Sequence, residues 1–157
     1  MALALAAIGA GPASAQTVPL NFKLPDDYYT RIVELAREAL PTARLANGKP
    51  VPLESAEERA QPLLPADIER RIIDTGVVSG LASWCGLDWT TLFRRMMLAE
   101  RGAKQWNDKQ LAYIGLLHGV SQGAIENSTR QQGSCTAKDK PRMSELLART
   151  AKIYDQK

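Results

Sequence analysis

A pair of cysteines limits most strongly what this chain can fold into. Cys85 and Cys135 are the only two cysteines, and they lie 50 positions apart. The spacing fits neither a C-x-x-C redox motif nor a C-x-x-C-H haem attachment motif. A structural zinc site would require more cysteine or histidine ligands than the chain contains. The remaining alternatives are a structural disulfide that closes a long loop and two buried free thiols.

The first fifteen residues indicate the compartment. They carry no charged side chain, and the short apolar run at 3–8 is followed by a Gly-Pro turn and by the small–x–small segment at 13–15. This pattern predicts a signal peptide over residues 1–15 that is cleaved after Ala15. The alternative is an Ala-rich tail with no targeting role. Export favours the disulfide, because the periplasm and the cell exterior are oxidising.

The composition is typical of one globular domain. The chain has 157 residues, of which 45% are hydrophobic and 24% are charged, so we predict a single helical domain over 16–157. The net charge is only +3, and acids and bases are interleaved. This argues against nucleic-acid binding, which usually requires a clustered basic surface. No stretch of the mature chain is apolar enough to span a membrane.

Helical periodicity predicts an all-α fold. Apolar residues recur at helical spacing in five segments whose ends carry helix-terminal residues. The segments are 26–40, 65–84, 88–102, one from 107 to a polar loop at 126–134, and one that begins between 136 and 141.

Prolines separate the first two of these helices. The segment 41–65 contains five prolines and an Asn-Gly turn at 47–48, so we predict an irregular segment that follows the surface. Ser55 followed by Glu58 predicts a capping box and one or two helical turns. The predicted architecture is a small orthogonal bundle of four to five helices joined by one disulfide.

Five glycines fall inside the predicted helices and require an explanation. Each costs about 1 kcal/mol relative to alanine in a helix interior. Close approach of two helices would offset that cost. We expect Gly76 and Gly80 to lie against the helix from 107, with Gly115 or Gly119 at the contact. The alternative is a narrow groove for a ligand or a partner helix. The candidates are Gly76, Gly80, Gly115, Gly119 and Gly123.

His118 is the only histidine, and most acid–base and metal chemistry uses this residue type. No serine, cysteine or carboxylate lies at a spacing that indicates a catalytic group with it. We expect a partly buried histidine that is hydrogen-bonded to a neighbouring helix. Its ordinary pKa of roughly 6.5 also makes it a candidate pH-sensitive group. We predict no catalytic residue, metal or cofactor; a small enzyme using His118 with a nearby carboxylate is the alternative.

Aromatic and methionine side chains cluster between residues 84 and 106. Such a cluster usually belongs to a core, but a half-exposed subset can bind another protein, because Trp and Met are favoured at interfaces. The candidate partner surface consists of Trp89, Phe93, Met96, Met97 and Trp106.

The second half of the chain resembles two families of small periplasmic bacterial proteins. The cysteine spacing and the charged segment Cys-Thr-Ala-Lys-Asp-Lys at 135–140 are similar to the HdeA-type acid-stress chaperones, which are helical and have one disulfide. The segment Tyr-Ile-Gly at 113–115, followed by His118, Gly119 and Cys135, is similar to the Tai-type immunity proteins, which block toxins in the periplasm.

These features predict a non-catalytic periplasmic or secreted protein whose partner is another protein. An inhibitor or immunity protein needs a rigid, preformed surface, and close helix contacts with a disulfide favour rigidity. A stress chaperone would instead loosen in acid as its paired carboxylates become protonated. We favour the first of these two alternatives.

Overall fold

This computed structural model describes residues 24–155, which contain six α-helices and one 3-10 helix joined by loops. Those residues contain no β-strand, so the all-α prediction is confirmed. The predicted signal peptide at 1–15 lies outside the described residues. The helices are α1 (Asp26–Ala39), η1 (Leu40–Thr42), α2 (Ala56–Arg59), α3 (Ala66–Trp84), α4 (Thr90–Gly102), α5 (Asp108–Arg130) and α6 (Asp139–Lys152).

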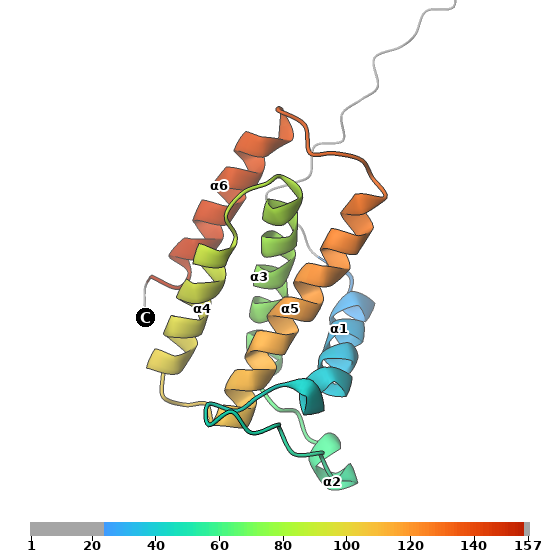
Figure 1. Cartoon of the computed structure of the whole chain (residues 1–157), viewed down its shortest axis with the longest axis vertical. Helices are drawn as coiled ribbons and strands as arrows, with labels where there is room; N and C mark the ends of the chain where they lie inside the picture. Colours follow the sequence, from blue (N-terminus) through green and yellow to red (C-terminus); the bar gives the residue numbers. More distant parts are fainter. Residues whose placement is uncertain (1–23, 156–157) are drawn as a thin grey trace, which may run out of the picture.

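α3 and α5 form the centre of the bundle. They pack against each other more extensively than any other two helices, α1 and α4 each contact both of them, and α6 packs against α3 and α4. In Figure 1 the long helices run along the long axis of the molecule, and α2 lies apart at one end. The predicted orthogonal arrangement is therefore not confirmed.

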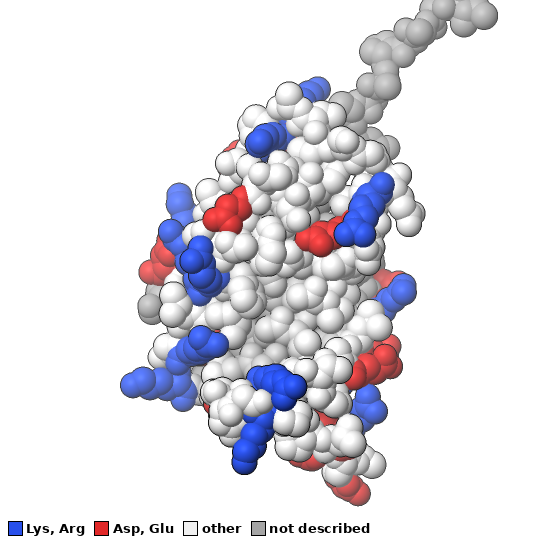
Figure 2. All heavy atoms as spheres, viewed as in Figure 1, with Lys and Arg blue, Asp and Glu red and all other residues white. Residues whose placement is uncertain are grey.

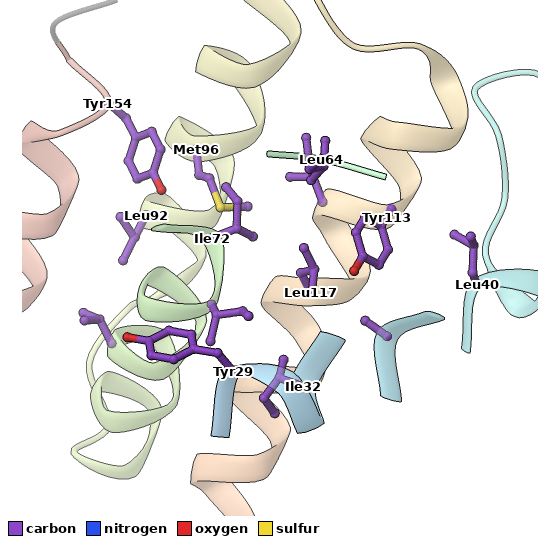
Figure 3. Packing of buried hydrophobic residues seen from close by; sticks show 14 of the residues in the cluster. Tyr29, Ile32, Leu40, Leu64, Ile72, Leu92, Met96, Tyr113, Leu117 and Tyr154 are labelled. Carbon is purple, nitrogen blue, oxygen red and sulfur yellow. The ribbon is translucent and has the colours of Figure 1, made fainter. Parts of the chain in front are cut away.

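The buried core lies between these helices. On α1, Tyr29, Ile32 and Ala36 are buried at three- and four-residue spacing, in agreement with the predicted stripe. Figure 3 shows side chains from α1, α3, α4 and α5 and from the C-terminal turn converging on this core. Burial of each large aliphatic side chain contributes about 1.5–3 kcal/mol. The largest fully buried apolar side chains are Ile32, Leu40, Ile72, Ile73, Leu92, Met96, Tyr113, Ile114 and Leu117.

Two glycines allow α3 to approach α5 closely. A methyl carbon on Gly76 would lie 2.5 Å from the main-chain oxygen of His118, and one on Gly80 would lie 2.8 Å from that of Gln122. Any larger residue would therefore push the two backbones apart. The predicted close packing of Gly76 and Gly80 against this helix is confirmed.

Arg37 fixes the segment between α1 and α3. Its guanidinium donates to both carboxylate oxygens of Glu54, at 3.0 and 3.3 Å, and to three main-chain carbonyls at the end of α2. Lys109 of α5 adds a second cation 3.2 Å from Glu54. The predicted capping box of Ser55 and Glu58 forms at the start of α2. Charge pairing and capping thus hold a segment whose prolines prevent regular structure.

α5 is longer than predicted. The polar composition of 126–134 indicates a loop, but α5 continues to Arg130. Gln122 donates to the Glu126 carboxylate one turn further on, at 2.9 Å, and the Thr129 side chain is 6% exposed. Packing of this last turn outweighs its low helix propensity, so the loop prediction for 126–130 is wrong.

The disulfide joins the end of α3 to the loop before α6. Cys85 and Cys135 are bonded, with their Cα atoms 5.0 Å apart, so the predicted disulfide is confirmed. Beside it, the Trp84 indole donates to the main-chain oxygen of Gly133 at 2.7 Å. These two contacts fix the α5–α6 loop to the core.

Replacing both cysteines by serine should lower the free energy of unfolding by about 4 kcal/mol, because a cross-link over this loop length restricts the unfolded chain. The double variant Cys85→Ser/Cys135→Ser should show this loss in urea unfolding. Reduced wild-type protein is the control and should match the variant. An unchanged unfolding midpoint in both would contradict the prediction.

Candidate functional site

The three glycines of α5 lie on a different side of this helix from the α3 contact. A methyl carbon on Gly115, Gly119 or Gly123 would have no atom of another element within 4 Å. The prediction that Gly115 or Gly119 meets the glycines of α3 is therefore wrong. The contact is made by other residues of α5, such as Ser121, which donates to the main-chain oxygen of Ile73 at 2.8 Å. We call Gly115, Gly119 and Gly123 the glycine face.

A groove borders one end of the glycine face. It lies between α4, α5 and the 44–46 turn and has a volume of about 320 Å³. Met97 and Gly115 lie on its two helical walls, and Arg44 and Arg101 carry the cations among its lining residues. The rest of the lining consists of Leu45, Ala46, Asp108, Leu111 and Ala112.

Four of the five predicted partner residues are partly accessible. Trp89, Phe93, Met97 and Trp106 are half-buried, whereas Met96 is fully buried in the core. The inclusion of Met96 in an exposed surface is therefore wrong. It occupies the inward side of α4, the same side as buried Leu92 and Glu100.

The surface over α4 and α5 is uncharged at its middle. Figure 2 shows this face with Lys, Arg, Asp and Glu side chains placed mainly towards its edges. The α4 side of the face carries the exposed basic residues Arg94, Arg95, Arg101 and Lys104. Arg95 is paired with Asp155 at 2.9 Å, and within residues 24–155 Arg101 and Lys104 form no ion pair. The middle of the face is thus uncharged, and exposed arginines and a lysine lie along its α4 side.

His118 lies beneath this face. Its side chain is 1% exposed, and Nε2 lies 2.9 Å from the hydroxyl of Ser79 on α3. The ring of Phe93 covers it with 4.7 Å between centroids, and the Trp89 centroid is 6.1 Å away. His118 is not among the residues that line the groove between α4 and α5. A substrate could reach neither His118 nor fully buried Ser79, so this arrangement gives the enzyme alternative no support.

Burial also determines the charge of His118. Removal of the ring from water disfavours the imidazolium and lowers the pKa of His118 from 6.5 to about 4. The ring is therefore neutral near pH 7. The sequence predicted a partly buried histidine hydrogen-bonded to a neighbouring helix; the hydrogen bond is present, but the ring is fully buried. The sequence offered no signal for Ser79 as its partner.

The described residues offer no metal centre. Across 24–155, no three His, Cys, Asp or Glu side chains are grouped so that they could hold a metal ion. In the same part of the chain, no helix combines the length and apolar character needed to cross a membrane.

The chain matches no protein-family model, no curated protein and no solved structure. The predicted resemblances to acid-stress chaperones and immunity proteins thus remain predictions, and any functional conclusion rests on the geometry.

The two classes of glycine should respond oppositely to alanine. Gly119→Ala should raise the free energy of unfolding by about 1 kcal/mol, because the added methyl group meets nothing and alanine favours the helix. Gly76→Ala should lower it by about 1–3 kcal/mol, because a rigid main-chain oxygen blocks the methyl group. Urea unfolding of both variants measures the contrast, and a stability loss in both would show that the glycine face is packed.

Acid should destabilise the fold through His118. A folded-state pKa below the unfolded value means that stability is complete above pH 6.5 and is lost as the pH falls towards 4. The gap between 6.5 and about 4 corresponds to a loss of about 3 kcal/mol. Burial raises the pKa of Glu69 and Asp74, so these carboxyls add stability as the pH falls and oppose the effect.

A neutral replacement isolates the histidine contribution. His118→Gln keeps a hydrogen-bonding side chain but does not titrate. Its free energy of unfolding, measured from pH 7 to 4, should fall by less than that of the wild type. Parallel pH profiles for the two proteins would refute the assignment to His118.

Proposed function

We propose that the protein is an exported, non-catalytic protein that binds one partner protein on the glycine face and the adjoining groove. The observation that carries this proposal is the open row of Gly115, Gly119 and Gly123 beside a groove, on a face whose charged side chains lie mainly towards its edges. A partner backbone could approach α5 closely there, because no side chain stands between them.

The glycine face has a stability cost that the described fold does not offset. Three glycines inside α5 cost about 3 kcal/mol in total relative to alanine. Gly76 and Gly80 recover a similar cost through contact with α5, but Gly115, Gly119 and Gly123 make no such contact. Close contact with a partner at Gly115, Gly119 and Gly123 would offset their cost, as contact with α5 offsets the cost of Gly76 and Gly80.

The surrounding side chains favour an acidic protein surface. Phe93 and Met97 are half-buried beside the glycine face, and aromatic and methionine side chains are favoured in interface centres. Arg44 and Arg101 line the groove, and Lys104 follows α4 as a further exposed cation. Carboxylates on a partner would complement these charges, speed association and make it salt-dependent.

Export is supported by the disulfide. Disulfides persist in the periplasm and outside the cell and are rare in the reducing cytoplasm, and the Cys85–Cys135 bond fits an extracellular or periplasmic protein. The predicted signal peptide at 1–15, cleaved after Ala15, accords with the same compartment.

An inhibitor or immunity-type role suits this surface best. The glycine face is preformed, and the α3–α5 contact, the disulfide and the Arg37–Glu54 pairing hold its supports rigid. A stress chaperone is the second candidate, because buried His118 favours loosening in acid. Suppression of client aggregation at about pH 2–3 but not at pH 7 would favour the chaperone.

A leucine on the glycine face provides the test. The wild-type protein should recover one partner in stoichiometric amount from a periplasmic extract at neutral pH. Gly119→Leu should weaken that complex at least about 100-fold, as expected for a blocked interface centre, while it folds normally because the space around Gly119 is open.

Ala148→Leu is the matched control, because Ala148 is exposed on α6, away from this face. It should bind the partner as the wild type does. Equal affinity of wild type and Gly119→Leu for the recovered partner would exclude the glycine face as the docking site.

A further inference from the structure

A second hollow lies on the side of α3 that faces away from α5. It is a cleft of about 660 Å³ between α3 and α6, within the range of small-molecule sites. Asp74 and Val78 line it, and each lies two residues, or about 200° of helix rotation, from a glycine that contacts α5. The cleft is therefore separate from the glycine face.

The base and one edge of the cleft are apolar. Val78 and Leu146 are nearly fully buried, at 3% and 6% exposure, whereas Ile153 at the end of α6 is 50% exposed. Ile153 is one of the few large hydrophobic side chains exposed within residues 24–155. A ligand with an aliphatic part would cover it and remove apolar surface from water.

Arginines line both walls. Arg70 and Arg71 come from α3 and Arg149 from α6. Arg149 forms no ion pair with any residue in 24–155. Arg71 donates to buried Glu100 at 2.8 Å, and its Nε is itself buried. Because Arg70 and Arg71 are both paired within the fold, Arg149 is the arginine of the cleft walls that has no ion pair among the described residues.

Both carboxylates of the cleft, Asp67 and Asp74, lie on the α3 wall. Asp74 accepts a hydrogen bond from the Tyr29 hydroxyl at 2.7 Å. Arg70 stacks on the Tyr29 ring, 4.5 Å from its centroid, and pairs with Asp26 at 2.7 Å. Asp67 is exposed at the cleft margin. An anionic group would therefore be placed on the α6 wall, beside Arg149.

We propose that this cleft binds an anionic amphiphile, with its carboxylate or phosphate head on Arg149 and its aliphatic chain along Val78, Leu146 and Ile153. The head group would use charge-assisted hydrogen bonds to a guanidinium. The chain would gain affinity from burial against the apolar base. This binding site does not depend on the proposed partner surface.

Calorimetric titration of the purified protein tests the proposal. The probes are dodecanoate, dodecyl phosphate and dodecyltrimethylammonium, each below its micelle-forming concentration. At least one anionic probe should bind, and the cationic probe should bind at least about tenfold more weakly. Tighter binding of dodecanoate would indicate a free fatty acid as the source, and tighter binding of dodecyl phosphate a phospholipid fragment.

Two variants locate the head and the chain. Arg149→Gln should weaken the better anion at least about tenfold, whereas Lys152→Gln should not, although Lys152 lies in the same last turn of α6. Ile153→Ser should weaken it as well, and half-exposed Ile153 can be replaced without a cavity in the core. Equal binding of cation and anion, equal effects of the two charge variants, or no binding of either anion would overturn the proposal.

Discussion

The close approach of α3 and α5 at Gly76 and Gly80 is the contact on which the rest of this structure depends. These glycines place α3 directly against the main-chain oxygens of His118 and Gln122. α1 and α4 pack against the resulting pair, and α6 reaches it through α3 and α4. A wider spacing between the two central helices would displace every helix that rests on them, because cores are packed as densely as organic crystals.

Several buried polar side chains are hydrogen-bonded between helices, and these contacts select one arrangement of the helices. Neutral His118 meets Ser79 between α5 and α3. Fully buried Glu100 accepts from Arg71 of α3 and from the Trp106 indole. Each pair would leave a buried donor or acceptor unsatisfied if its helices slid past one another, so the hydrogen bonds fix the register of helices that hydrophobic packing brings together.

The same central contact separates two surfaces with different properties. α5 presents its glycines and, with α4, a face whose charged side chains lie mainly towards its edges. α3 presents a polar and apolar cleft against α6. The first is suited to a protein surface, because it is broad and lacks protruding side chains over α5. The second is suited to a small amphiphile, because it is concave and combines arginines with an aliphatic base. The two proposed binding sites therefore lie on different sides of the same central helix pair.

The sequence by itself determined where most of the helices lie and which cysteines are bonded. Period-3.6 apolar stripes, the capping box at Ser55 and the prolines between 41 and 65 each act within a few residues, so they located the helices. The cysteine pair predicted the disulfide. The orientation of α5 was decided only by the tertiary structure. Its residues are apolar or small almost all round, so no hydrophobic stripe marks an inward side, and the sequence placed Gly115 and Gly119 in the core contact. In the folded protein, Ser121 and Ile125 of α5 pack against Gly76 and Gly80 of α3. This contact determines which side of α5 faces α3, because two backbones approach most closely where a glycine faces a side chain that can fill its space. The glycines of α5 consequently lie on another side of the helix.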